Sequence, residues 1–332
     1  MIVVVNAPHD ASVNQVSANE QLVHMLKQMG ELRAVTLSGN YVVQGNFHLL
    51  IGGPFSLERS KGVGLARKIG ADLALKLIDE GLVKNRVIFC TDADALLPKD
   101  YFMHAEELAH KDIAAGIFPF VHEKPHNDRQ AEAIKLYEMR LNRYVEGLAS
   151  AGSPYAFHTI GSTIAINAQH YAKVRGFPAL PAGEDFYILN KLRKVGRVLS
   201  LLGEPIYLSA RVSDRVLFGT GPALAKILHH DDPKQAPIFY DSQVFRCLGQ
   251  FLRHAEETIQ SGFCDVMLDL DEHLRTAFCS LDQGQLKKTL MSRKKIDDRL
   301  KAFHDYFDAF KTLKFIHYLR DHHFPNSPFY LD

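Results

Sequence analysis

The chain has 332 residues, 46% of them hydrophobic, and a formal net charge of +1. This length suits one large α/β domain with an appendage or two domains, and the hydrophobic content is ordinary for a globular protein. A charge so close to neutral gives no bulk field that favours nucleic acid as a partner.

The cysteines and the apolar runs indicate a compartment. The four cysteines lack paired zinc-site spacing, and Cys90 lies in an apolar segment, which favours a reducing environment. Residues 1–6 are too short for a signal sequence, and no apolar run approaches the roughly 20 residues of a membrane span. We therefore expect a soluble, cytoplasmic protein without a transmembrane segment.

The first 120 residues alternate between strand and helix patterns. Strands are predicted at residues 2–5, 48–51 and 87–90, and amphipathic helices at residues 13–29 and 63–80. This alternation argues for a mainly parallel sheet with helices on its faces.

The rest of the chain becomes increasingly helical. Helices are predicted at residues 128–148 and 186–194, and strands at residues 163–166 and 198–202. From about residue 236 the pattern is helical throughout, so we place a boundary near residue 232, giving domains 1–232 and 233–332.

The strand at residues 87–90 ends in two carboxylates, Asp92 and Asp94. Open α/β sheets bind ligands at the carboxyl ends of their strands. Paired carboxylates suit Mg²⁺ or Mn²⁺, which bind through one or two such groups plus substrate phosphates. Taken alone, the pair fits a solvated strand end better.

A glycine-rich segment begins the helix at residues 63–80. It starts like a dinucleotide fingerprint, but Arg67 stands where the last glycine is required, which excludes a nicotinamide or P-loop site. Arg67 and Lys68 lie in the first turns of that helix, where backbone N–H groups favour an anion. A solvated basic helix start fits equally well.

A second acidic pair, Glu184 and Asp185, follows Gly183 at the start of another helix. Acidic residues there are commonly caps that stabilise the helix dipole. The functional alternative makes one of them a general base.

Two arginines, Arg211 and Arg215, precede the Gly-Thr-Gly sequence that ends at residue 221. Arginine recognises phosphate oxygens, and such hinge-rich loops can close over a ligand. His229 and His230 follow, with capping or surface positions as the default and a single metal contact as the alternative.

Order and spacing together resemble the family 2 glycosyltransferases of the GT-A fold. In that family a Gly-x-x-x-Ala-Arg-like helix precedes an Asp-x-Asp strand, and a Gly-led strand, a Gly-Phe turn and a Glu-Asp pair follow about ninety residues later. Here Asp94 and Glu184 are 184 − 94 = 90 residues apart. The matching segments are residues 64–70, 91–94, 161–166, 176–177 and 183–186. The resemblance covers roughly residues 48–221 and implies a GT-A-like nucleotide-binding domain with a helical C-terminal region.

On the donor side, the resemblance implies a nucleotide-sugar bound through Mn²⁺ or Mg²⁺. Asp94 would be the direct metal ligand, and Asp92 would face the metal and the donor ribose or sugar. Arg67 would lie near the nucleotide. The segment with Arg211 and Arg215 would close on the diphosphate, and His229 is a further candidate metal ligand.

On the acceptor side, the resemblance implies an inverting transfer to a carbohydrate or another hydroxyl group. Asp185 would be the base, and Glu184 would orient the acceptor. Further acceptor-side candidates are Tyr155, His158 and Gly161. The helical region after residue 232 could shape the acceptor site, mediate a homo-oligomer or dock on a membrane.

One feature departs from the family. Typical members open with a strand ending Pro-x-x-Asn-Glu, which helps to bind the nucleobase, whereas residues 2–8 here resemble the second strand. Either the first strand is missing or residues 1–50 are rearranged. Asp10 is a candidate carboxylate on the nucleobase side.

Two other functions compete with this one. A phosphatase resembling the haloacid-dehalogenase group would use Asp92 as nucleophile, although Ala95 stands where that group usually has threonine. A degenerate glycosyltransferase-like module would serve as a binding or scaffold protein.

Overall fold

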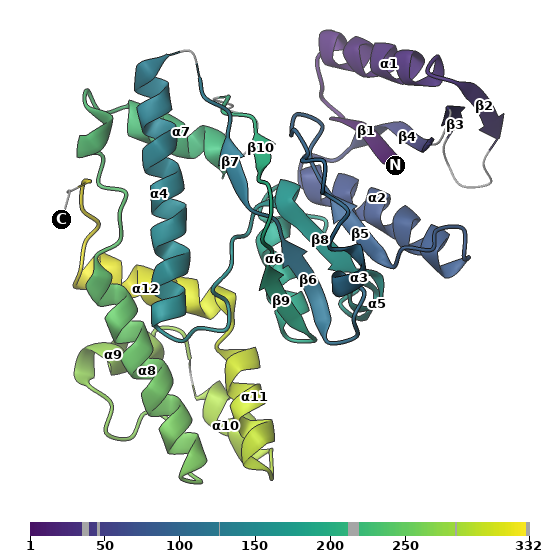
Figure 1. The fold of residues 1–332 in the computed structure, drawn as a ribbon. Coiled ribbons are helices and arrows are strands. Elements are labelled where there is room, and N and C mark those ends of the chain that lie inside the picture. The colour runs from purple at the N-terminus through teal and green to yellow at the C-terminus, as the bar shows by residue number, and fades with distance from the viewer. Residues whose placement is uncertain (35–39, 45–46, 126, 212–218, 283, 330–332) are drawn as a thin grey trace. The chain divides into compact units, whose positions relative to one another are not determined.

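The computed structural model describes residues 1–34, 40–44, 47–125, 127–211, 219–282 and 284–329, and shows an α/β protein (Figure 1). The chain divides into two compact units. The described residues of Met1–Phe120 and Thr159–Leu208 form the first, here called the α/β unit. Those of Val121–His158, of residues 209–211 and of residues 219–329 form the second, the helical unit.

The α/β unit contains two four-stranded sheets. In the first, the strand order is β1 (Ile2–Pro8), β4 (Phe47–Leu57), β3 (Asn40–Gln44) and β2 (Glu31–Ala34). β1 and β4 are parallel, and the other two pairs are antiparallel. Helix α1 (Val13–Lys27) begins at a capping box formed by Ser12 and Gln15, and its Val23 packs with Val5 and Ile51 of this sheet.

The second sheet has the order β5 (Val87–Cys90), β8 (Ile164–Asn167), β6 (Ile113–Ile117) and β9 (Arg197–Ser200). β8 is antiparallel to β5 and β6, and only β6 and β9 are parallel. The prediction of a mainly parallel sheet is therefore wrong for the described strands. Every residue of β6 and β8 is buried, and such continuous apolar runs are typical of parallel strands although they do not determine direction.

Helix α2 (Gly62–Asp79) packs against β1 and β5. Its first turn lies against the loop that precedes α6 (Glu184–Arg193), where the Gly64 N–H donates to the Leu180 carbonyl at 3.0 Å. A Cβ atom at Gly64 would lie 2.4 Å from the Pro178 carbonyl oxygen, so only glycine permits this approach. The remaining helical segments of the unit are α3 (Ala105–Leu108), the 3₁₀ turn η1 (Gly161–Thr163) and α5 (Ala168–Lys173).

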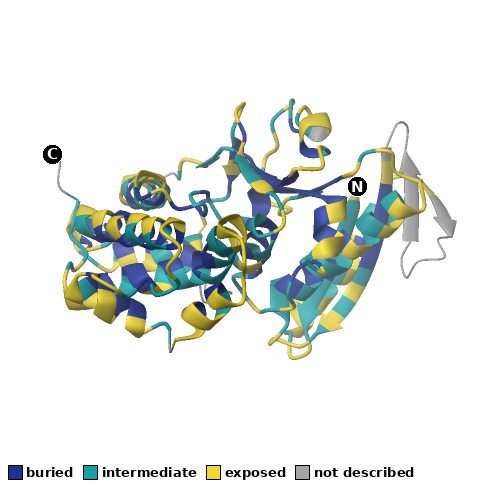
Figure 2. Ribbon diagram, turned by 90° about the horizontal axis from the view of Figure 1, so that it is seen from below, coloured by how far each residue is buried: buried dark blue, intermediate teal, exposed yellow. Residues whose placement is uncertain are grey.

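Two short strands, β7 (Phe120–His122) and β10 (Ile206–Leu208), lie where the chain passes from one unit to the other. In both units the helices present buried residues on one side and exposed residues on the other (Figure 2). The four cysteines, all among the described residues, are free thiols. Across the described parts of the chain, no helix combines the length and the apolar character needed to span a bilayer.

The helical unit is organised around α4 (Asp128–Ser150), which contacts α7 (Thr220–Leu228) and α8 (Ser242–Gln260) (Figure 1). Tyr137 of α4 shares a core cluster with Leu224 and Ile227 of α7. The other helices are the 3₁₀ turn η2 (Pro233–Gln235), α9 (Glu272–Cys279), α10 (Gln285–Met291), α11 (Ile296–Tyr306) and α12 (Ala309–His322). The helical unit therefore includes α4 and α7 together with the helices after residue 232.

Candidate functional site

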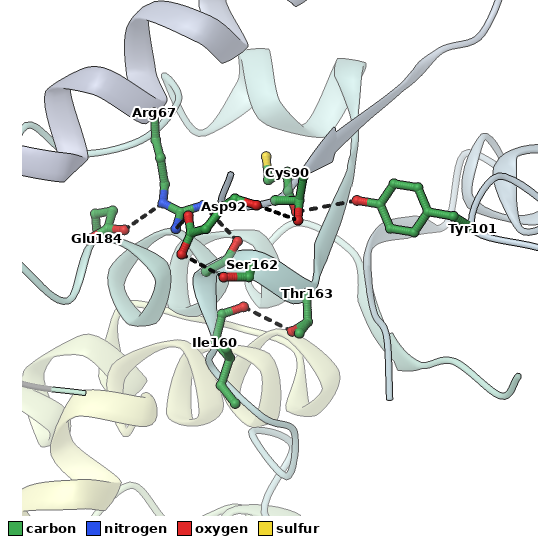
Figure 3. Close-up of polar contacts among 10 residues, drawn as sticks. Arg67, Cys90, Asp92, Tyr101, Ile160, Ser162, Thr163 and Glu184 are labelled. Carbon is green, nitrogen blue, oxygen red and sulfur yellow. Dashed lines mark hydrogen bonds and ion pairs between the residues drawn. The ribbon is translucent and has the colours of Figure 1, made fainter. Parts of the chain in front are cut away.

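Four segments of the α/β unit that are distant in the sequence meet around one arginine (Figure 3). Arg67 lies in the second turn of α2, Asp92 follows β5, and Glu184 is the first residue of α6. Gly161 and Ser162 belong to η1. The contacts span 25, 94 and 117 residues of sequence, so the fold assembles residues that the resemblance had placed in one site.

Each nitrogen of the Arg67 guanidinium donates to a protein acceptor. Nε lies 2.9 Å from Glu184 Oε1, Nη1 lies 2.8 Å from the Gly161 carbonyl oxygen, and Nη2 lies 2.5 Å from Asp92 Oδ1. The side chains of Arg67 and Glu184 are only 11% and 5% exposed. Burial alone would lower the pKa of Arg67, but the neighbouring carboxylates of Asp92 and Glu184 raise it. The arginine therefore organises the cluster through its own protein acceptors, and its predicted place near a nucleotide stays a prediction.

Asp92 is held at both carboxylate oxygens. Arg67 donates to Oδ1, and the Ser162 hydroxyl donates to Oδ2 at 2.6 Å. The side chain remains 46% exposed, so it faces solvent in a fixed orientation. Ser162 had no predicted role, and the only available signal was a hydroxyl residue next to Gly161.

Gly161 packs directly against the guanidinium of Arg67. A Cβ atom at this position would lie 2.6 Å from Arg67 Nη2 and 2.7 Å from Cζ. Contacts that short do not occur in real structures, so the guanidinium fits only because residue 161 lacks a side chain. This packing role is additional to the acceptor-side role, which stays a prediction.

Asp185, the second residue of α6, has a carboxylate whose ionisation is suppressed in the folded protein. Burial desolvates its carboxylate, and the adjacent Glu184 repels its charge, so its pKa is raised from 3.8 to about 6. The backbone N–H groups of Phe186 and Gly161, together with the Arg67 charge, lower the pKa in part. Gly183 precedes the pair with φ +75° and allows the turn that begins the helix. A carboxylate with these properties is suited to general-base chemistry near neutral pH.

Asp94 lies on the exposed turn that follows β5. Asp92 accepts the Ala95 N–H through its carbonyl, and Leu96 then pairs with Tyr207. Within the residues described, no three His, Cys, Asp or Glu side chains gather in a metal-holding arrangement. Mg²⁺ and Mn²⁺ sites often complete their shells with water and substrate phosphates. Asp94 and Asp92 each offer a carboxylate to such an ion, and the orientation of Asp92 is fixed by hydrogen bonds to both of its oxygens.

Tyr155 and His158, predicted on the acceptor side, belong to the helical unit. Tyr155 is 4% exposed, and its hydroxyl donates to the His304 carbonyl at 2.9 Å. This contact gives Tyr155 a structural role there. His158 is partly buried, and its burial lowers the pKa of the imidazole.

Two of the residues predicted to bind phosphate or metal are in the helical unit. Arg211 and His229 belong to the helical unit, and His229 ends α7 as its C-cap. Its ring packs edge-on against His230 at 6.3 Å. Arg215 lies outside the described residues.

Comparison with known proteins adds no assignment. No protein-family model matches the chain, and no curated protein matches it significantly. The function must therefore be argued from the geometry of the site itself.

Proposed function

We propose that the α/β unit is a GT-A-like glycosyltransferase domain that moves a sugar from a nucleotide-sugar donor to an acceptor hydroxyl, with inversion. The observation that carries the proposal is the Arg67 cluster. It brings the second helix, the Asp-x-Asp strand end and the Glu-Asp helix start into direct contact. These are the segments that the resemblance to family 2 glycosyltransferases names, and nothing in their local sequence requires them to meet.

The donor side is supported by the end of β5. Asp94 would hold the divalent cation, which when bound offsets the negative charge of the donor diphosphate. Asp92, fixed by Arg67 and Ser162, presents a rigid acceptor to a donor hydroxyl group. Rigid placement of such groups is what allows binding energy to position the anomeric carbon.

The acceptor side is supported by Asp185. Its carboxylate would accept the proton of the acceptor hydroxyl as that oxygen attacks the anomeric carbon and the nucleoside diphosphate departs. A pKa of about 6 leaves the group ionised at neutral pH yet more basic than an ordinary aspartate. Glu184 faces Arg67 at 2.9 Å, so it orients the site through the arginine rather than by contacting the acceptor.

The geometry favours this function over the phosphatase. An aspartate nucleophile needs an oxygen that can attack phosphorus. Asp92 has one oxygen in an ion pair with Arg67 and the other in a hydrogen bond with Ser162, and both contacts withdraw electron density from the carboxylate.

Calorimetric titration with UDP, GDP, ADP and their sugar conjugates, in Mn²⁺ and then in EDTA, tests the donor site. We expect metal-dependent binding of one nucleotide series, lost in Asp94→Ala. The control is Asp79→Ala, which removes an exposed carboxylate about 18 Å from residue 67 along α2.

Binding that is equal in Asp94→Ala and wild type would refute the metal role. No binding of any nucleotide would refute the donor site and favour the binding or scaffold module.

A further inference from the structure

A buried histidine in the helical unit links three segments and plays no part in the proposed sugar transfer. His122 ends β7, Glu138 lies in the middle of α4, and Thr220 begins α7. Glu138 Oε1 lies 2.9 Å from His122 Nδ1, and Thr220 Oγ1 lies 3.1 Å from His122 Nε2. The order carboxylate, imidazole, hydroxyl is that of a base-activated nucleophile.

The hydrogen bonds assign the tautomer of His122. Glu138 Oε1 also accepts the backbone N–H of His122 at 2.6 Å, and an ionised carboxylate can only accept. Nδ1 therefore carries the proton that it donates to Glu138, and Nε2 presents its lone pair to Thr220. The imidazole is 1% exposed, and Thr220 Oγ1 is its hydrogen-bond partner at Nε2.

The position of Thr220 suits an attacking hydroxyl. It follows Gly219, whose φ of +105° turns the chain into α7, and it is partly exposed whereas the imidazole behind it is buried. Backbone N–H groups in the first turn of a helix point along its axis beyond the N-terminus, where they stabilise developing negative charge. Pro222 follows in that turn and donates nothing, which leaves Thr220 and Gly221 as its first N–H donors.

We propose that Glu138, His122 and Thr220 form a second catalytic centre that cleaves activated esters through an acyl-threonine intermediate. Thr220 Oγ attacks the acyl carbonyl carbon, and its proton passes to His122 Nε2. The bond from that carbon to the leaving oxygen breaks, and the leaving group takes the proton from Nε2. Water then attacks the acyl-threonine, gives its proton to Nε2, and releases the carboxylic acid as Thr220 Oγ recovers a proton.

The residues packed near His122 and Thr220 are apolar. The ring of Tyr137 lies 5.8 Å from that of His122, and Leu224, one turn into α7, is fully buried in the same cluster. An uncharged, short aliphatic ester matches such apolar surroundings and is the simplest probe.

The first test is hydrolysis of p-nitrophenyl butyrate by the full chain, combined with labelling by a fluorophosphonate and mapping of the adduct by mass spectrometry. We expect the adduct on Thr220. Thr220→Val, which keeps the shape and removes the hydroxyl, should abolish both signals, and Thr220→Ser should retain them. Glu138→Gln should slow hydrolysis at least about tenfold, because it disturbs the tautomer.

Thr276→Val is the matched control. The Thr276 hydroxyl bonds only within its own helix, to the Glu272 carbonyl at 2.7 Å, so hydrolysis and labelling should be unchanged. Wild-type hydrolysis in Thr220→Val, or an adduct mapped elsewhere, would overturn the proposal and leave His122 as a structural link. If Thr220→Val fails to fold, the adduct position in the wild type and in Thr220→Ser decides the question.

Discussion

Replacing Asp185 with asparagine should stabilise the protein at neutral pH while removing sugar transfer. Wild-type Asp185 has a folded-state pKa of about 6, raised from 3.8 because its carboxylate is desolvated beside Glu184. A raised carboxyl pKa means that the folded state binds the proton more tightly than the unfolded state. The associated stability is present below the unfolded-state pKa and is lost as pH rises through the folded-state pKa.

The size of the effect follows from the shift. The difference between about 6 and 3.8 is about 2 pKa units, which corresponds to about 3 kcal/mol at 1.36 kcal/mol per unit. Asparagine does not titrate, so the free energy of unfolding of the wild type relative to the variant should fall by about 3 kcal/mol between about pH 3 and about pH 7. Asparagine has one acceptor oxygen where aspartate has two, so one backbone N–H can lose its acceptor in the variant. This loss would lower the stability of the variant by about 1 kcal/mol at every pH.

Urea titration at several pH values measures this difference. The chain contains no tryptophan, so far-UV circular dichroism is the suitable signal. Asp265→Asn provides a control of opposite sign. Lys287 lies 2.7 Å from Asp265, and this hydrogen bond lowers the pKa of the carboxyl. The wild type should therefore gain stability over that variant as pH rises.

A difference between the wild type and Asp185→Asn that stays constant with pH would refute the reasoning. It would mean that the Asp185 carboxylate is not desolvated in the folded state. The general-base assignment would then lose its physical basis.

Three further predictions concern the same cluster. The rate of sugar transfer by the wild type should rise with pH through a midpoint near 6, where Asp185 loses its proton, and a flat pH–rate profile would exclude it as the base. Gly161→Ala should lower the free energy of unfolding by about 1–3 kcal/mol, because the new Cβ displaces the Arg67 guanidinium, which is paired with one buried and one half-exposed carboxylate. Unchanged stability in urea titration would show that Arg67 can move at no cost. Arg67→Lys should lower the free energy of unfolding by a similar amount, about 1–3 kcal/mol, because the compact ammonium group of lysine cannot donate to all three acceptors in this geometry. A urea midpoint equal to that of the wild type would contradict the organising role of Arg67.

Much of the local structure was predictable from the sequence. The predicted helices at residues 63–80 and 128–148 correspond to α2 (Gly62–Asp79) and α4 (Asp128–Ser150), and the predicted strand before Asp92 is β5 (Val87–Cys90). Apolar periodicity, glycine and proline determine these features within a few residues of sequence. Strand direction and the partners of α4 depend on distant segments, and the prediction of a mainly parallel sheet was wrong for the described strands.

The same distinction applies to the site. The resemblance to family 2 glycosyltransferases grouped Arg67, Asp92 and Glu184, and the local patterns only placed Asp92 just after a strand and Glu184 at the start of a helix. The hydrogen bonds of the Arg67 guanidinium were not predictable, because its three acceptors come from segments up to 117 residues away. Ser162 and Gly161 acquire their roles only when η1 is placed beside α2.

The reactivity of the Cys90 thiol can be used to measure local opening of the structure near the Arg67 cluster. Cys90 ends β5 two residues before Asp92, and desolvation raises its pKa to about 11. Thiolate chemistry is thereby suppressed in the closed state, whereas Cys279 is exposed and should react at once with a disulfide reagent. Cys247 is buried and Cys264 is half-buried, so peptide mapping has to assign the slow labelling of Cys90. The rate at that thiol then follows local opening at the end of β5, without any probe having been introduced into the chain.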